Sequence, residues 1–513
     1  MRRFAFALLA AAGLAAASAA HAQPGGPPPP PVQPVADPAC AALAAPGLIP
    51  DMTVSKAQGM SLDGGSFCEV TAILSPVAGS HIGVVYRMPM QWNGRVVGYG
   101  GGGWAGNVGL QTVRADLARG YATLQTDGGH PSPAAFDAGW TAPGGKPDEV
   151  ALNDFSWRAV HQMTVVGKLV AARYYGKAQE KALFIGCSTG GRMALMEAQR
   201  FPDDYDGIVA GAPVYSLRVQ LAEIYRDQVF AKAGGFHQNE LDYVHSKVLA
   251  DCDAQDEVKD GVLGDPAACR YNPDSLRCKP GQDTGCLTDV QVDALKALYS
   301  EAKGRDGQVY AYPYSKGSEP AWATFQNIEA DPVKAAQDRD LALRAIMFGD
   351  PNFSFKTFDI ARDGPKARAG SFAKYYEADD PNLKPFLGKG GKLILWHGLD
   401  DQGPSPWGTV AYDKRMVAAT GELAAADTRM FLAPGVLHCA GGPGPSQIDW
   451  LASLDGWVKT GAAPNRITAR TPAPFPGQPA PARNVTRPLC AYPAQARYDG
   501  KGDPNVESSF SCK

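Results

Sequence analysis

Three kinds of side chain in this sequence could together cleave an ester or amide bond: a serine, a carboxylate and a histidine. The serine is Ser188, in the run Gly186-Cys187-Ser188-Thr189-Gly190, a G-x-S-x-G motif between an apolar run and a helical pattern. In that context the motif is typical of a nucleophile elbow, a sharp turn that lifts a serine hydroxyl above a sheet. The motif alone is weak evidence, because glycine and serine also mark ordinary tight turns.

An acid and a base follow the serine in the chain. Asp400 and Asp401 follow an apolar run at residues 392–396 that predicts a buried strand, and either could be the acid. His438 lies in the loop after a further strand candidate at residues 429–432. The order serine, aspartate, histidine is the one used on α/β-hydrolase folds.

Other histidines compete with His438 for the role of base. His130, His161 and His397 each precede or adjoin the wrong element. Considered alone, His438 would more often be a structural histidine than a catalytic one. Together with Ser188 and an aspartate it predicts acyl transfer, in which the histidine deprotonates the serine and the carboxylate orients the histidine.

A run of four glycines supplies candidate donors for an oxyanion. Gly100 to Gly103 follow a strand candidate, and glycines let backbone N–H groups approach a substrate oxygen closely. We expect donors from the loop at Gly102 and Gly103 and from the N–H of Thr189, directly after the nucleophile. A phosphate-binding loop is the alternative, but no Lys-Ser or Lys-Thr follows the glycines.

The ten cysteines are an even number, which in an exported chain is typical of a disulfide framework. Sequence alone does not fix the connectivity. The natural pairs are Cys252–Cys269, Cys278–Cys286, Cys490–Cys512 and Cys40–Cys68. Cys187 and Cys439 remain, and they adjoin Ser188 and His438, so a formed triad would bring the two sulfurs together. A zinc site is the competing interpretation, and the lack of any C-x-x-C pair argues against it.

Alternating strand and helix patterns must position these residues. We expect strands at 95–99, 121–125, 182–185, 207–211, 392–396 and 429–432, and helices at 160–175 and 192–200. This alternation predicts an α/β fold with a mostly parallel sheet covered on both faces. From 216 to 385 the rhythm breaks into a polar, aromatic block with four cysteines. We expect this block to be an insertion that caps the active site.

The N-terminus predicts export. Arg2 and Arg3 precede an apolar run too short to span a bilayer, and Ala20-His21-Ala22 fits a signal-peptidase site. The expected organisation is a signal peptide at 1–22, a proline-rich leader at 23–38, core at 39–215, lid at 216–385 and core again at 386–513. The protein is then periplasmic or secreted. No later apolar run predicts a membrane span, and the net charge of −3 without a basic stripe gives no sign of nucleic-acid binding.

An acidic segment in the inserted block could hold a metal ion. Asp253, Asp256 and Asp260 lie close together, and clustered carboxylates suit calcium. The spacing is not that of an EF-hand, so a solvated acidic turn is as compatible with the pattern as a metal site.

The sequence resembles the tannase/feruloyl esterase family, which includes tannases, feruloyl esterases and mono(2-hydroxyethyl) terephthalate hydrolase. The matching segments are Arg158-Ala159-Val160-His161, Tyr174-Tyr175-Gly176, Gly186 to Arg192, Glu197 to Pro213, Gly390 to Ile394 and His438 to Pro445. They are spread over nearly the whole mature chain and are highly specific.

The resemblance implies an α/β-hydrolase core with a large lid inserted between nucleophile and acid, and a Cys187–Cys439 bridge. It also implies that Asp401 is the acid, because in the family the acid stands four residues after the histidine of a His-Gly motif. The lid of the family carries calcium on three aspartates and two carbonyls. Here these would be Asp253, Asp256 and Asp260 with the carbonyls of Val258 and Val262.

The resemblance weakens inside the lid. Terephthalate half-ester hydrolases use a lid arginine for the free carboxylate, and here only Lys316, Arg339 and Arg344 lie nearby, none assignable to that role. The aromatic residues Trp322, Phe325, Phe348, Phe353 and Phe355 could line an acyl pocket or form the core of the lid.

We therefore expect a serine carboxylesterase that hydrolyses esters of small aromatic acids, of the feruloyl, galloyl or terephthaloyl type, through an acyl-enzyme. Calcium would be structural, and no organic cofactor is expected. The alternative is a calcium-stabilised binding protein of the same fold without turnover. The sequence gives no information on oligomeric state.

Overall fold

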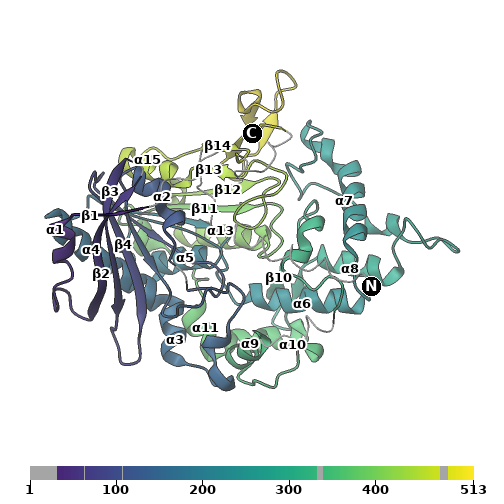
Figure 1. Ribbon diagram of the computed structural model, residues 1–513. Coiled ribbons are helices and arrows are strands. Elements are labelled where there is room, and N and C mark those ends of the chain that lie inside the picture. Colours follow the sequence, from purple (N-terminus) through teal and green to yellow (C-terminus); the bar gives the residue numbers. More distant parts are fainter. Residues whose placement is uncertain (1–31, 63, 107, 332–338, 474–482) are drawn as a thin grey trace, which may run out of the picture.

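A ten-stranded sheet forms the centre of the molecule (Figure 1). The computed structural model describes residues 32–62, 64–106, 108–331, 339–473 and 483–513. The predicted signal peptide at 1–22 and the leader up to residue 31 lie outside the described residues. The strands of the sheet are β1 (Pro34–Val35), β2 (Met52–Leu62), β3 (Gly65–Leu74), β4 (Ile82–Pro89), β5 (Arg95–Tyr99), β6 (Ala122–Thr126), β7 (Lys181–Cys187), β8 (Gly207–Gly211), β11 (Lys392–Gly398) and β12 (Thr428–Ala433).

The strand order is β1-β2-β3-β4-β6-β5-β7-β8-β11-β12. Strands β1 to β4 pair antiparallel, and β4 joins β6 antiparallel. From β6 through β5, β7, β8 and β11 to β12 every pairing is parallel. All six strands expected from the sequence belong to this parallel part, with ends within two residues of the predicted ones. Because the strands are parallel, their carboxyl ends meet at one edge of the sheet.

Helices cover both faces of the sheet, as the alternation predicted. Neighbouring residues of one strand enter different cores: Leu393 and Leu395 of β11 join one buried cluster, while Ile394 and Trp396 join the other. This is the period of two expected for a strand buried on both sides. The helices of this part are α1 (Pro38–Ala42), α2 (Leu110–Ala118), α3 (Glu149–Asn153), α4 (Ala159–Tyr175), α5 (Thr189–Arg200), α13 (Pro406–Thr420), α14 (Glu422–Asp427) and α15 (Trp450–Thr460).

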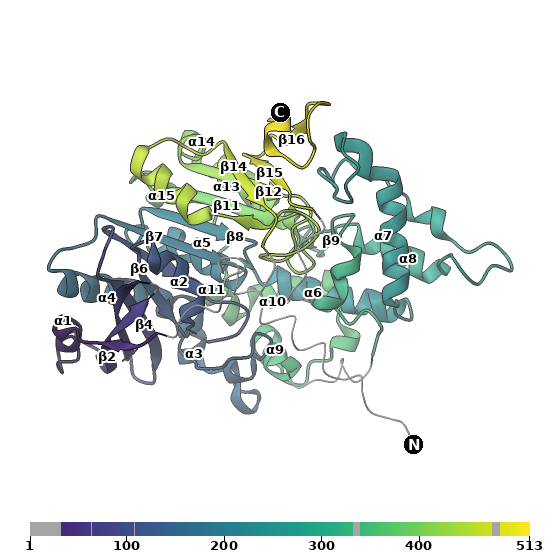
Figure 2. The same ribbon diagram turned by 45° about the horizontal axis from the view of Figure 1, so that its top comes forward.

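Residues 212–391, between β8 and β11, contribute no strand to the main sheet in the described part of the chain. We call them the inserted block; in Figure 2 its helices α7 and α8 lie beside the sheet. It has its own core around Phe230, Leu241 and Trp322. Its elements are α6 (Arg218–Lys232), α7 (Gln238–Cys252), α8 (Asp289–Leu298), β9 (Ala302–Lys303), β10 (Val309–Ala311), α9 (Arg339–Phe348), α10 (Ile360–Ala369), α11 (Ser371–Tyr376) and α12 (Lys384–Leu387).

The C-terminal region adds two small sheets. One contains β13 (Gln447–Ile448), β14 (Arg466–Arg470) and β15 (Thr486–Cys490), and the other β16 (Ala496–Tyr498) and β17 (Phe510–Cys512). All ten cysteines form disulfides, in the pairs expected from the sequence: Cys40–Cys68, Cys187–Cys439, Cys252–Cys269, Cys278–Cys286 and Cys490–Cys512. Among the described helices, none combines the length and apolar character that a membrane crossing requires.

Candidate active site

Ser188 occupies the turn between β7 and α5. Its backbone has φ 62° and ψ −123°, a region that residues other than glycine rarely adopt. The turn is held from β8, because the Ser188 N–H donates to the carbonyl of Gly211 at 3.0 Å and the Ser188 carbonyl accepts from Val214 N–H at 3.1 Å. The strained turn therefore has the geometry expected of a nucleophile elbow.

The glycines around Ser188 allow close backbone contacts. A Cβ at Gly186 would lie 2.3 Å from the carbonyl oxygen of Gly190, and one at Gly191 would lie 2.3 Å from that of Gly211. Both distances are far inside van der Waals contact. The spacing of glycines in the motif thus follows from the tight passage of β7 into α5 against β8.

The four-glycine loop packs against the same turn. Gly100 N–H donates to the carbonyl of Ile185 at 3.0 Å, next to β7. The hydroxyl of Thr189 donates to the carbonyl of Gly103 at 2.9 Å, which ties the loop to the first residue of α5. Gly103 has φ 56°, and a side chain there would collide with Ala135. The structure thus brings Gly103 of the expected oxyanion loop into direct contact with Thr189.

A disulfide joins the serine turn to the loop after β12. The Cα atoms of Cys187 and Cys439 are 5.9 Å apart. Ser188 and His438 are their immediate chain neighbours, so the bridge brings together two residues separated by about 250 positions of sequence.

His438 is bound to Asp401. Its Nδ1 lies 2.8 Å from Asp401 Oδ2, and its backbone N–H donates to Gln402 Oε1 at 3.1 Å. Since Nδ1 faces the carboxylate, Nε2 is the ring nitrogen left for a reaction partner. This is the orientation in which an imidazole can act as a base toward a serine hydroxyl.

Charges at the site keep Asp401 ionised and favour the imidazolium. Burial by itself would raise the pKa of Asp401, but His438 and the hydrogen bond from His397 outweigh it and lower the pKa to about 2. Burial by itself would lower the pKa of His438, but the Asp401 carboxylate raises it above the ordinary value. An ionised aspartate beside the histidine is the arrangement that stabilises a cation formed during proton transfer.

Asp400, the other carboxylate of the pair, faces away from this arrangement. Its Oδ1 has no hydrogen-bond partner among the described residues, and the carboxylate that bonds His438 Nδ1 is that of Asp401. Burial and the nearby Glu319 carboxylate raise the pKa of Asp400 to about 7. The geometry therefore favours Asp401 over Asp400 as the acid, where strand position alone left both open.

An aromatic ring of the inserted block contacts the imidazole of His438, and a ring of the core packs behind it. Phe325 of the inserted block packs edge-on against His438 at 5.4 Å between ring centroids, and Phe136 of the core packs edge-on against Phe325 at 5.8 Å. The other aromatic candidates lie elsewhere. Trp322 is fully buried against Tyr314, and Phe348, Phe353 and Phe355 pack on one another. Among the aromatic candidates from the sequence, Phe325 is therefore the one in contact with His438.

The cationic candidates of the inserted block are engaged with other rings. Lys316 Nζ lies 5.5 Å from the centroid of Tyr299, and the guanidinium of Arg344 lies 5.0 Å from that of Phe355. The side chain of Arg339 lies outside the described residues. No carboxylate-binding role follows for either described side chain.

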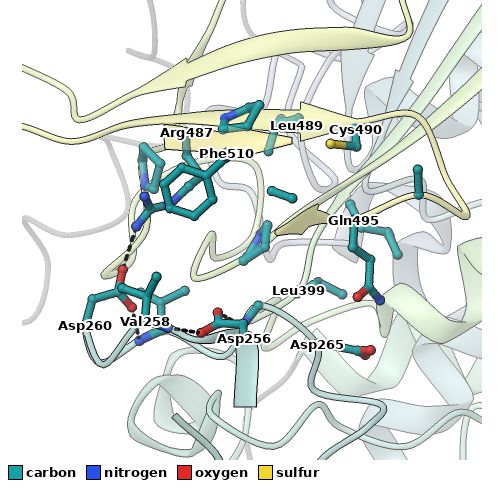
Figure 3. A pocket seen from close by; sticks show the side chains of 18 of the residues that line it. Asp256, Val258, Asp260, Asp265, Leu399, Arg487, Leu489, Cys490, Gln495 and Phe510 are labelled. Carbon is teal, nitrogen blue, oxygen red and sulfur yellow. Dashed lines mark hydrogen bonds and ion pairs between the residues drawn. The ribbon is translucent and has the colours of Figure 1, made fainter. Parts of the chain in front are cut away.

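The acidic segment forms an ordered loop below the C-terminal strands (Figure 3). Backbone N–H groups donate to its carboxylates: Gly261 to Asp253, Val258 to Asp256 and Val262 to Asp260. Asp260 also forms an ion pair with Arg487 at 2.6 Å. The loop borders a pocket of about 300 Å³ whose lining includes none of Ser188, Asp401 and His438.

Two residues at the site were missed in their present roles. Gln402 binds the His438 N–H, and His397 Nε2 lies 3.0 Å from Asp401 Oδ2. His397 is the last residue but one of β11 and Gln402 stands in the loop that follows, and proximity to the expected acid was the available signal. Which way their side chains turn depends on the loop after β12, which the sequence alone does not place.

Comparisons with known proteins identify the family. The family model described as "Tannase and feruloyl esterase" matches residues 68–513. The chain is 33% identical over 490 residues to mono(2-hydroxyethyl) terephthalate hydrolase of Piscinibacter sakaiensis, covering 83% of this chain and 80% of the relative. It is 32% identical over 463 residues to a probable feruloyl esterase of Arthroderma benhamiae, covering 87% of this chain and 85% of the relative.

Solved structures share the fold. Feruloyl esterase B of Aspergillus oryzae superposes with a TM-score of 0.81 at 24% identity, over 93% of this chain and 99% of that one. Tannin acyl hydrolase of Aspergillus niger superposes with a TM-score of 0.75 at 20% identity, over 93% and 94%. The fold is therefore that of the α/β-hydrolases, and the chain belongs to the tannase and feruloyl esterase family of carboxylic ester hydrolases.

Proposed function

We propose that this protein is an exported serine carboxylesterase that hydrolyses esters of small aromatic acids, with Ser188 as nucleophile, His438 as base and Asp401 as the acid that orients it. The observation that carries the proposal is the junction of three elements: the strained Ser188 turn, the Cys187–Cys439 bridge and the 2.8 Å bond from His438 Nδ1 to Asp401. Each part alone has structural explanations, whereas their convergence matches the needs of acyl transfer.

In the proposed reaction, His438 Nε2 takes the Ser188 hydroxyl proton as Oγ attacks the ester carbonyl carbon. The N–H groups of Thr189 and of Gly102 and Gly103 stabilise the oxyanion. His438 then donates its proton to the departing alcohol, leaving an acyl-enzyme on Ser188. Water, deprotonated by the same imidazole, releases the acid, and Asp401 stabilises the imidazolium in both halves of the cycle.

The aromatic preference rests on the rings near the base. Phe325 of the inserted block packs edge-on against His438, and Phe136 of the core packs edge-on against Phe325. Aromatic surfaces of this kind bind a flat acyl ring through stacking and edge contacts. Two relatives that match most of the chain are named as a mono(2-hydroxyethyl) terephthalate hydrolase and a probable feruloyl esterase, which supports the same substrate class here. The inserted block, with bounds proposed at 216–385, would act as the lid.

Initial rates on methyl ferulate, methyl gallate and mono(2-hydroxyethyl) terephthalate at matched concentrations test the proposal. We expect kcat/KM for at least one of these esters to exceed that for an aliphatic methyl ester of similar size by ten-fold or more. A burst of nitrophenol from a small activated ester tests the acyl-enzyme. Equal rates on aromatic and aliphatic esters would contradict the aromatic preference, and turnover by Ser188→Ala would contradict the nucleophile.

We also propose that the acidic loop binds calcium as a structural ion through Asp253, Asp256, Asp260 and the carbonyls of Val258 and Val262. All these donors are oxygen atoms, which suits a hard cation. Among the described residues, ligand oxygens of these three carboxylates do not all lie within 4.8 Å of one another. They would therefore have to move closer together to bind the ion. Asp260 would share its charge between calcium and Arg487.

A chelator tests the calcium proposal. A ligand bound only by the folded state raises stability by mass action, so removal should lower Tm and added calcium should restore it. The matched variant is Asp256→Asn, which should lose the response to calcium. An unchanged Tm, with no calcium found in the purified protein by elemental analysis, would contradict the proposal.

The disulfides support the proposed export, because disulfides persist in oxidising compartments. The five disulfides fit a periplasmic or secreted protein. N-terminal sequencing of the mature protein, expected to begin near Gln23, tests the predicted cleavage.

A further inference from the structure

A second histidine lies on the carboxylate that we propose as the catalytic acid. Asp401 Oδ2 is 2.8 Å from His438 Nδ1 and 3.0 Å from His397 Nε2. Asp401 Oδ1 accepts from Gly403 N–H at 2.8 Å. His397 and Asp401 are both fully buried, so neither can exchange these partners for water. The carboxylate is thus held from three sides, and one of the three contacts comes from a histidine outside the proposed triad.

The surroundings of His397 fix the direction of its hydrogen bond. Nε2 lies 3.0 Å from Asp401 Oδ2 and 3.0 Å from the carbonyl oxygen of Pro404. Both oxygens can only accept, because the carboxylate is ionised and a carbonyl has no proton. Nε2 therefore carries a hydrogen, whatever the charge of the ring, and this hydrogen faces both acceptors, Asp401 Oδ2 and the Pro404 carbonyl.

The opposite ring nitrogen anchors His397 to a helix. Nδ1 lies 2.8 Å from Thr409 Oγ1 in α13. When His397 is neutral with its proton on Nε2, the threonine hydroxyl donates to Nδ1. His397 itself is the last residue but one of β11, where parallel pairing sets it against Leu432 of β12. The imidazole is thus held by strand β11, helix α13 and the loop after β11 together.

We propose that His397 is a positioning residue that locks Asp401 in the rotamer needed to orient His438. The inference rests on the proposed function, because it assigns His397 a role through Asp401. With only His438 and Gly403 on it, the buried carboxylate could turn and its two oxygens would exchange partners. The His397 donor also shares the charge of Oδ2, so it changes how strongly that oxygen attracts the proton on His438 Nδ1.

Two substitutions at one position test the inference. His397→Leu removes the donor but keeps a buried side chain, whereas His397→Gln places an amide N–H near the position of Nε2. We expect His397→Leu to lower kcat by about 10²-fold, the effect of a misplaced catalytic group, with KM within a few-fold. The acid limb of the kcat/KM profile, which reports the base, should be displaced. His397→Gln should restore most of kcat and return the limb toward its wild-type position.

Control variants separate this role from general stabilisation. His161 is another histidine paired with an aspartate, bonded to Asp204 at 2.7 Å and stacked on Phe201, and it has no contact with Asp401. His161→Leu should lower Tm without moving the acid limb. If His397→Leu does not fold, Thr409→Val removes the Nδ1 partner instead, and a smaller fall in kcat with the same displacement is expected.

The outcomes are distinct. Equal losses in His397→Leu and His397→Gln, or an acid limb that stays in place in His397→Leu, would overturn the positioning role. Asp401→Asn, assayed in parallel, tests the proposed function itself. An active Asp401→Asn would overturn the triad, whereas an inactive Asp401→Asn beside a His397→Leu enzyme of wild-type kcat would overturn only the role of His397.

Discussion

Asp400 and Asp401 are adjacent and almost equally buried, but their pKa values are shifted in opposite directions. Asp401 is 0% exposed and Asp400 3% exposed. Two imidazoles lower the pKa of Asp401 to about 2, while burial and the Glu319 carboxylate raise that of Asp400 to about 7. Burial by itself raises the pKa of both carboxyls, so the difference comes from what each side chain faces.

The two aspartates face different halves of the molecule. Asp401 points to His438, on the loop after β12, and to His397. Two groups of the inserted block shift the pKa of Asp400: Glu319 raises it and His245 lowers it. Asp401 thus connects the loop after β11 to His438, the proposed base, whereas Asp400 lies near Glu319 and His245 of the inserted block.

The buried charge opposite Asp400 is itself well bound. Glu319 accepts from the hydroxyl of Tyr299 at 2.6 Å, from Gly317 N–H at 2.9 Å and interacts with His245 Nδ1 at 3.1 Å. This carboxylate is satisfied inside its own block, whereas Asp400 is left with an unpartnered Oδ1.

The largest difference between the two aspartates should appear in turnover. Asp401→Asn should lower kcat by about 10⁴, because the amide favours the wrong histidine tautomer. Ser188→Ala should lower kcat by about 10⁶. Asp400→Asn should stay within a few-fold of wild type. Steady-state kinetics on an activated ester measures all three, and equal losses from the two aspartate variants would contradict the assignment of the acid.

The next largest effect should come from removing the Cys187–Cys439 bridge, which joins the Ser188 turn to the loop that carries His438, the partner of Asp401. Replacing Cys187 and Cys439 together with serine should lower kcat by about 10²-fold, with a smaller change in KM, because without the bridge the proposed nucleophile and the proposed base would lose their fixed separation. Stability should fall by about 2–5 kcal/mol. The control is the double replacement of Cys490 and Cys512, which join the C-terminal strands and should affect Tm but not kcat. A control that loses as much activity would contradict a special role for the Cys187–Cys439 bridge.

The pH dependence of stability should run in opposite directions for the two side chains. The raised pKa of Asp400 means that the folded state binds its proton more tightly than the unfolded state does. Stability then falls as pH rises from about 4 to about 7, by up to about 4 kcal/mol. The lowered pKa of Asp401 gives stability that is present above about pH 4 and lost as pH falls toward 2.

Urea denaturation of wild type and Asp400→Asn at pH 5 and pH 8 measures the Asp400 part. We expect the unfolding free energy of Asp400→Asn, relative to that of the wild type, to be higher at pH 8 than at pH 5. A difference in unfolding free energy that is the same at both pH values would show that Asp400 does not titrate in this range.

The smallest expected effects come from the partners of Asp400. Glu319→Gln removes the like charge and should lower the pKa of Asp400, which reduces the loss of stability between pH 5 and 8. His245→Gln removes an opposing charge and should increase that loss. Because both substitutions also break buried hydrogen bonds, the slope with pH is compared rather than the absolute stability. Slopes that shift in the same direction in both variants would contradict the electrostatic account.

The sequence by itself determined the elements and the type of chemistry. Apolar runs and glycine spacing around Ser188 predicted β7, the sharp turn and α5, because these features depend on neighbouring residues. The order of serine, aspartate and histidine, with cysteines flanking Ser188 and His438, predicted the same junction that the structure contains. The resemblance to the family selected Asp401, whereas strand position left both aspartates open.

Only the tertiary structure decided which groups face one another. The opposite pKa values of Asp400 and Asp401 arise from His438, His397 and Glu319. Glu319 lies in the inserted block, and no local pattern places its carboxylate opposite Asp400. The contact of Phe325 with His438, and of Arg487 with Asp260, likewise joins distant segments. Hydrogen bonds and charge interactions act over a few ångströms in space, so their partners are set by the packing of whole elements, which sequence spacing does not encode.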